Sequence, residues 1–288
     1  MKGCDFMLKD DALNQFVFLM KFRNLSQNTI TMYEFYISRF IDFIQKDDVS
    51  SFDLKDAQNF VLMMKERGDN PQSINVVICA IRYFYETVLD MPLLRRQFPN
   101  IRYTEKDPLL FTKDQIISLL DNAFDVKTRV LLLLGIDCGF RAREVVNLRI
   151  SDIHSDTMTI SINNSKRNKS RLVKLSPACL DALRTYWKVY KPKDYFFPGR
   201  DGSSHAHVAC VHYHFRTYLK QFSFYSDDFH YHSLRHTFAT NMLENGCDVF
   251  LLKKLLGHSS FSSTARYIHM TTGDIQNTVS LSQVWGLR

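Results

Sequence analysis

The stretch His232-Ser233-Leu234-Arg235-His236-Thr237-Phe238-Ala239-Thr240 is the most informative part of this 288-residue chain. It lies beyond Ser176, where apolar residues recur with a helical period. An arginine flanked by two histidines suits a site that handles phosphate. A guanidinium fork matches two phosphate oxygens, and imidazole exchanges protons near neutral pH. We therefore expect this stretch to be helical and to contribute to an active site.

Three further segments carry the rest of the chemistry. The first is Gly139-Phe140-Arg141-Ala142-Arg143-Glu144, and the second is Lys166. The third is Leu256-Gly257-His258-Ser259-Ser260, followed by Tyr267 nine residues after His258 and by His269. Cleaving a phosphodiester without a metal needs fixed cations, a nucleophile and an acid for the leaving alkoxide. Arginines, a tyrosine that can form a covalent ester and a lysine that can donate a proton supply these parts.

The order Arg, Lys, His-x-x-Arg, His, Tyr resembles the tyrosine recombinase (phage integrase) family. Residues 139–269 match its catalytic domain nearly motif for motif. The pattern Leu25-Ser26-x-x-Thr29-x-x-x-Tyr33 is similar to the first-domain signature of the Xer-type members. The resemblance therefore covers both parts of the chain.

This resemblance implies catalytic roles for six residues: Arg141, Lys166, His232, Arg235, His258 and Tyr267. In the family the two arginines clamp the scissile phosphate, and the lysine protonates the 5′ oxygen. The first histidine assists proton transfer at the tyrosine, and the second hydrogen-bonds the phosphate. The tyrosine becomes linked to a 3′-phosphate.

Neighbouring residues are expected to support these six. Glu144 is expected to steady the basic groups, and His236 to hold the segment around Arg235. DNA contacts are expected from four further cations: Arg143, Arg167, Lys169 and Arg171. Among the cations of this region, the position of Lys166 favours it as the acid.

Helical patterns fill the first hundred residues. Ser26, Phe52-Asp53 and Asn70-Pro71 mark the starts of three helices. Periodicity is lost over about residues 91–108, where three prolines lie, and this stretch is interpreted as a linker. Thr112 then caps another helix, and residues 130–136 are apolar throughout, which indicates a buried helix.

A β-hairpin is predicted within the second part. Residues 157–162 and 171–175 alternate in polarity, and residues 163–170 between them form a basic tip. The predicted fold class is mostly α (α+β). A helical bundle over residues 1–104, a SAM-like core-DNA-binding domain by resemblance, precedes a mixed α/β catalytic domain with a small antiparallel sheet over residues 105–288.

The charge distribution favours a polyanionic partner for the second part. Residues 1–104 hold 13 basic and 13 acidic residues, whereas residues 105–288 hold 24 and 17. An excess of this kind suits DNA, although a solvated basic surface would look the same. The six cysteines are scattered singly, no secretory signal opens the chain and no stretch could span a bilayer. We therefore expect a cytoplasmic protein that does not enter membranes.

Histidine pairs could suggest a metal site, but we expect none. His212 and His214 are two residues apart, so they cannot share a helix face, and no cysteine or carboxylate pair completes a ligand set. The family resemblance likewise implies neither metal nor ATP, because the ester bond is conserved through strand exchange. No cofactor is expected.

The predicted function is site-specific DNA recombination through a 3′-phosphotyrosyl intermediate and a Holliday junction, for integration, excision or resolution. The resemblance implies a homotetramer on double-stranded DNA sites, possibly with a related recombinase as partner. Residues 275–288 would pack on a neighbouring subunit, or else on their own. Two alternatives are a type IB topoisomerase and a catalytically silent DNA-binding protein; retention of every chemical position disfavours the second.

Overall fold

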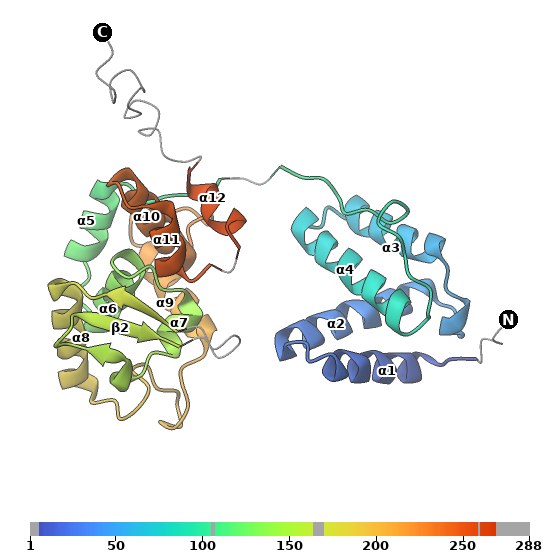
Figure 1. Ribbon diagram of the computed structural model, residues 1–288, viewed down its shortest axis with the longest axis horizontal. Coiled ribbons are helices and arrows are strands. Elements are labelled where there is room, and N and C mark those ends of the chain that lie inside the picture. Colours follow the sequence, from blue (N-terminus) through green and yellow to red (C-terminus); the bar gives the residue numbers. More distant parts are fainter. Residues whose placement is uncertain (1–5, 105–106, 164–169, 259, 269–288) are drawn as a thin grey trace, which may run out of the picture. The chain divides into compact units, whose positions relative to one another are not determined.

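The computed structural model describes residues 6–104, 107–163, 170–258 and 260–268. Contacts divide the chain into two compact units, Met1–Lys106 and Asp107–Arg288, each with its own hydrophobic core. Figure 1 colours the first unit blue to teal and the second green to red. The expectations for Lys166, Arg167, Lys169, His269 and the tail at 275–288 lie outside the described residues.

The first unit is the helical bundle that the sequence predicts. It consists of α1 (Lys9–Phe22), α2 (Gln27–Ile44), α3 (Leu54–Glu66) and α4 (Pro71–Thr87), with a 3₁₀ turn at Val49–Ser51. The three expected helix starts are confirmed: the side chains of Ser26, Asp53 and Asn70 accept backbone N–H groups of the helices that follow them. Helix α1 precedes these and was not marked by a cap in the sequence.

The second unit combines helices with a small sheet. Its helices are α5 (Lys113–Asp121), α6 (Val126–Ile136), α7 (Ala142–Val146), α8 (Pro177–Tyr190), α9 (Val208–Leu219), α10 (Tyr231–Glu244), α11 (Val249–Leu256) and α12 (Ser262–Ile268). A 3₁₀ turn, η2 (Ile150–Asp152), leads into strands β1 (Ile153–His154), β2 (Thr159–Ile162) and β3 (Arg171–Lys174). The expected fold class is confirmed.

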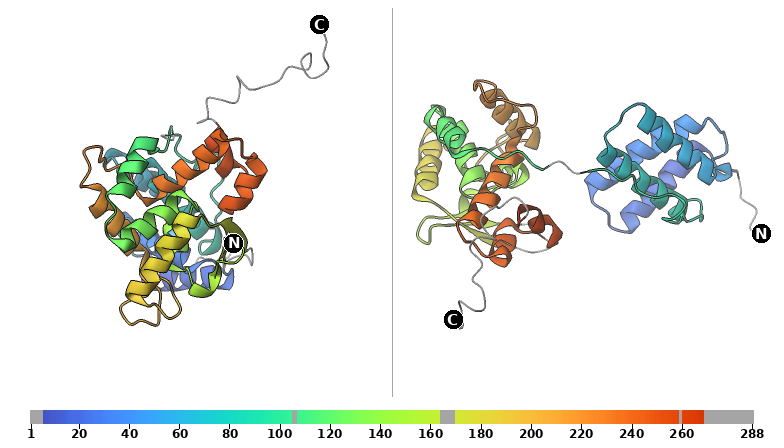
Figure 2. Two further views of the ribbon diagram at one scale, coloured as in Figure 1. Left: turned by 90° about the vertical axis from the view of Figure 1, so that its left-hand side faces the viewer. Right: turned by 90° about the horizontal axis from the view of Figure 1, so that it is seen from above.

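The sheet is antiparallel in the order β1-β2-β3. Ile162 pairs with Arg171 at the end of the hairpin next to its tip, which confirms the predicted hairpin. The side chains of Ile160, Ile162 and Val173 join the same core as helices α6 and α8. Figure 2 shows the ribbon of the chain from two further sides. Residues 164–169 of the polar tip are outside the described part of the chain.

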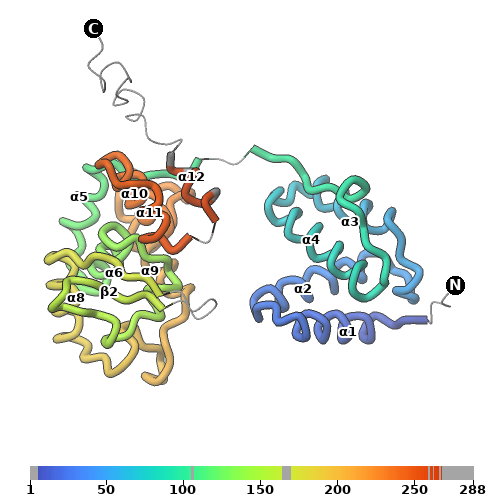
Figure 3. Tube along the Cα trace, viewed as in Figure 1, coloured from blue at the N-terminus to red at the C-terminus, as the bar shows by residue number. Residues whose placement is uncertain are grey.

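Helix α6 is the centre of the second unit, and α10 packs against it. Gly139, just after α6, has φ +62°, and a Cβ there would lie 2.6 Å from the Phe238 ring of α10. Only glycine allows this approach. The chain therefore turns tightly beside α10, and the motif at residues 139–144 reaches the helix that carries Arg235. The tube in Figure 3 shows α10, α11 and α12 side by side, in agreement with their contacts.

Candidate active site

Tyr267 lies on α12 and is 2% exposed. Its hydroxyl is 3.0 Å from Nδ1 of His236, and its ring stacks against that of His258 with centroids 6.3 Å apart. Helix α12 packs on both α10 and α11. His236 lies on α10, and His258 follows the end of α11. The tyrosine expected to be the nucleophile therefore lies next to two imidazoles.

Arg235 on α10 is fully buried. Its Nη1 donates to the carbonyl of Gly139 at 2.5 Å, and its Nη2 donates to the carbonyl of Leu256 at 2.6 Å. The Nε of Arg235 has no hydrogen-bond partner among the described residues. Burial, and then the charge of Arg141, lower the pKa of Arg235 to about 9, so the guanidinium still carries its charge at neutral pH.

Arg141 is more accessible, with 34% of its side chain exposed. Its Nη1 donates to Oε1 of Glu144 at 3.0 Å and to the carbonyl of Leu256 at 3.2 Å. The two arginines therefore share the Leu256 carbonyl at the end of α11.

Glu144 on α7 is the shared anion of this group. Burial alone would raise its pKa, but hydrogen bonds and charge from Arg171, with the charge of Arg235, lower it to about 2. Its Oε2 also accepts the backbone N–H of Arg141 at 2.8 Å. Glu144 therefore lies among the basic groups that it is expected to steady.

Arg171, expected to contact DNA, lies against Glu144. It is 7% exposed, and its two terminal nitrogens donate to the two oxygens of Glu144 at 2.8 Å each. Its Nε donates to the carbonyl of Leu255 at 2.6 Å. The guanidinium is turned into the protein, and the DNA contact expected of Arg171 stays a prediction. The alternation in β3 held the signal, because Arg171 has the same parity as the buried Val173.

The hydrogen bonds of His258 determine its tautomer. Its Nε2 is 3.2 Å from Nη2 of Arg235, and its Nδ1 is 2.9 Å from Oγ1 of Thr264. Arginine can only donate, so Nε2 accepts and Nδ1 carries the proton. Burial, and then the charges of nearby arginines, lower the pKa of His258 to about 3. Thr264 was not foreseen, since nothing in the sequence distinguishes it from other threonines.

Of the two histidines of α10, His236 and not His232 lies next to the hydroxyl of Tyr267. The hydroxyl of Tyr267 meets His236, whereas the ring of His232 contacts the ring of His236 edge to face at 4.6 Å. Burial, followed by the charge of His236, lowers the pKa of His232 to about 3. His232 is therefore neutral at pH 7 and stands one imidazole away from the tyrosine.

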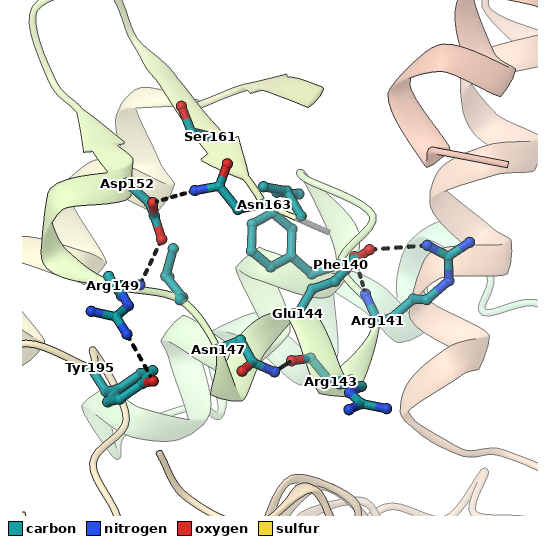
Figure 4. Close-up of a pocket in the computed structure, with 12 residues that line it drawn as sticks. Phe140, Arg141, Arg143, Glu144, Asn147, Arg149, Asp152, Ser161, Asn163 and Tyr195 are labelled. Carbon is teal, nitrogen blue, oxygen red and sulfur yellow. Dashed lines mark hydrogen bonds and ion pairs between the residues drawn. The ribbon is translucent and has the colours of Figure 1, made fainter. Parts of the chain in front are cut away.

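Arg143 borders a pocket at the base of the hairpin (Figure 4). Arg141 and Glu144 form an ion pair on one side of α7, whereas the guanidinium of Arg143 points in another direction. Across the pocket, Arg149 pairs with Asp194 and with the hydroxyl of Tyr195. Arg143 is exposed, so it remains available for the DNA contact expected of it.

Two kinds of feature are absent from the described ranges. No three side chains of His, Cys, Asp or Glu are grouped there in a way that could hold a metal ion. None of the helices described combines the length and the hydropathy that crossing a membrane requires.

Comparisons with known proteins agree with this arrangement. Residues 110–273 match the phage integrase family, and residues 13–94 match the phage integrase N-terminal SAM-like domain. The chain is 27% identical over 288 residues to the tyrosine recombinase XerA of Pyrococcus horikoshii, covering 99% of this chain and 98% of XerA. It is 25% identical over 284 residues to the tyrosine recombinase XerC of Staphylococcus epidermidis, covering 93% and 95%.

A solved structure shares the fold. The XerH site-specific recombinase in a post-cleavage complex with palindromic difH substrate superimposes with a TM-score of 0.74. The sequence identity is 18%, and the match covers 92% of this chain and 82% of XerH.

Proposed function

Because this chain belongs to the phage integrase family of tyrosine recombinases, we propose that it cuts and rejoins DNA at specific sites. In this proposal Tyr267 attacks the scissile phosphate and forms a 3′-phosphotyrosyl bond. Two pairs of strands are then exchanged in turn through a Holliday junction, with integration, excision or resolution of DNA as the outcome.

One observation carries the proposal. Tyr267, His258 and Arg235 form a continuous chain of contacts, and Arg141 joins it through the carbonyl of Leu256. A nucleophile and two guanidiniums thus meet within one unit although they are up to 126 residues apart in sequence. Fixed cations of this kind stabilise the charge that develops on phosphoryl oxygens.

Each bond change can be assigned to a group. The oxygen of Tyr267 would attack phosphorus as the bond to the 5′ oxygen breaks. The phenolic proton would pass to His236, which already meets the hydroxyl at 3.0 Å. The 5′ oxygen would take a proton from Lys166, and attack by the 5′ hydroxyl of the partner strand would later release the tyrosine. The phosphotyrosyl ester keeps the bond energy, so no step of this scheme needs ATP. The arginines and Lys166 supply the positive charge and the proton that a metal site would otherwise supply.

The partner proposed is double-stranded DNA. XerH was solved bound to its difH substrate, and a lambda integrase dimer was solved bound to a core site. By likeness we propose that this chain binds recombination sites and assembles there as a homotetramer, or together with a related recombinase. Arg143, Arg167 and Lys169 would contribute phosphate contacts, and the protein would act in the cytoplasm.

Mapping covalent junctions tests the proposal directly. The protein is incubated with genomic DNA of its host in excess chelator, denatured, and recovered with the attached DNA for sequencing. We expect junctions at Tyr267 that cluster at one sequence, and no adduct from Tyr267→Phe despite retained DNA binding.

Three results would contradict this. An adduct formed by Tyr267→Phe would move the nucleophile to another residue. Loss of all adducts in chelator, with recovery on adding one divalent ion, would overturn the metal-free scheme. Junctions spread over unrelated sequences, together with relaxation of a single supercoiled plasmid, would favour the topoisomerase alternative.

A further inference from the structure

Arg171 connects three parts of the site. It is the first residue of β3, and it reaches Glu144 on α7 and the carbonyl of Leu255 on α11. Gly257 lies directly against it: a Cβ on Gly257 would be 2.9 Å from Nη1 of Arg171. Each nitrogen of this guanidinium has a partner within the protein, and the residue is 7% exposed.

Glu144 faces more cations than it can neutralise. Arg171 binds both of its oxygens at 2.8 Å, Arg141 binds one at 3.0 Å, and Arg235 approaches to 3.7 Å. One carboxylate thus faces three guanidiniums, which leaves a net positive site. How the hydrogen bonds are divided decides which arginines keep donors for a phosphate, because each carboxylate oxygen competes directly with a phosphate oxygen.

We propose that Arg171 is a positioning residue that occupies Glu144 and thereby reserves Arg141 and Arg235 for the scissile phosphate. The inference rests on the proposed function. Without Arg171, the nearest cations to the two oxygens of Glu144 are Arg141 and Arg235. The carboxylate would then draw both guanidiniums toward itself and weaken the phosphate clamp while leaving the DNA-binding surface unchanged.

The test compares four variants with the parent on a nicked duplex built from the mapped junction sequence. They are Arg171→Met, Glu144→Gln, the double variant carrying both changes, and Lys174→Met. Lys174 is the matched control, because it lies on the same strand and loses the same charge but points to the exposed face. Dissociation constants at several salt concentrations and the rate of adduct formation are measured, and folding is followed by circular dichroism.

We expect Arg171→Met to bind DNA like the parent but to form the adduct at least about tenfold more slowly, since removing a transition-state donor outright costs ~10²–10³-fold. The double variant should react faster than Arg171→Met and within about threefold of Glu144→Gln. Once the carboxylate of Glu144 is removed, Arg141 and Arg235 are no longer drawn away from the phosphate, so the further loss of Arg171 should have little effect. Lys174→Met should react like the parent.

Other roles give different results. A direct phosphate contact would weaken binding in Arg171→Met and lower its salt slope by about one. A purely structural role would leave the double variant about tenfold or more slower than Glu144→Gln. Either result overturns the inference, and the second comparison holds even if Arg171→Met alone fails to fold. A parent that forms no adduct would instead reject the proposed function.

Discussion

At the scale of single residues, the hydroxyl of Tyr267 lies next to His236 rather than His232. Side-chain chemistry is a local property, so the sequence alone indicated arginines, histidines and a tyrosine suited to phosphoryl transfer. Which histidine meets Tyr267 was not predictable. His232 and His236 are four residues apart on α10 and therefore share a face. Only the packing of α12 brings the tyrosine to His236.

At Arg171, two features of the sequence point to different environments. Its charge and its place beside a basic tip indicated a DNA contact, whereas its parity in β3 indicated a buried position. Parity prevailed because Glu144 supplies two oxygens inside the protein. A buried cation is stable only with such a partner, and a sequence does not reveal a partner that lies 27 residues away.

Lys166, assigned from the sequence, is tested through its leaving group. Lys166→Ala should cleave ordinary DNA about 10²–10⁴-fold more slowly than the parent, because an alkoxide departs poorly without a proton. A bridging 5′-phosphorothiolate leaves without that proton, so it should largely restore cleavage. Both rates are measured on matched duplexes, with Lys169→Ala as the control. Equal defects of Lys166→Ala on the two duplexes would assign the acid role to another residue.

At the scale of elements, the hairpin and the helix starts followed from local signals, because caps and alternation are short-range patterns. The arrangement at the end of α11 did not. Its last carbonyls, those of Leu255 and Leu256, accept hydrogen bonds from Arg141, Arg171 and Arg235. Backbone acceptors carry no signature in a sequence. These two acceptors could therefore not be predicted from the sequence.

Gly257 ends α11 and tests this arrangement. It has φ +63°, so the left-handed backbone alone should lower the free energy of unfolding of Gly257→Ala by about 1–2 kcal/mol. The new Cβ would also press on Arg171. The matched control is Gly202→Ala, which has φ +69° but nothing within 4 Å. Urea denaturation should therefore show a larger loss for Gly257→Ala, together with slower adduct formation. Equal losses would mean that the contact with Arg171 contributes nothing.

At the scale of the whole molecule, the two units differ in their titratable groups. All ten histidines lie beyond residue 150, in the second unit. Burial holds the pKa of His232 and His258 at about 3, below the value of 6.5 expected in an unfolded chain. Between these values the unfolded state binds more protons, so stability contributed by these groups is present above pH 6.5 and is lost as the pH falls toward 3. Glu144 adds a loss in the same direction below about 4.5.

Mild acid should therefore weaken the second unit and spare the first. Amide hydrogen exchange of the full chain is compared at pH 7.5 and 5.5, after correction for intrinsic exchange rates. Protection in α6 and α10 should fall at pH 5.5, while protection in α2 and α4 stays the same. A variant carrying His232→Gln and His258→Asn should lose less protection than the parent on acidification. Uniform loss across both units would contradict this assignment.

The carbonyls at the end of α11 also bear on which changes evolution can accept there. Any residue type offers the same backbone oxygen, so apolar exchanges at positions 255 and 256 keep the three arginines satisfied. A change of length does not. Inserting one residue into α11 would advance its end by about 1.5 Å and rotate it by about 100°, carrying every acceptor out of register at once. Among related chains, the residue types in this segment should therefore vary, but the number of residues between Asp248 and His258 should not.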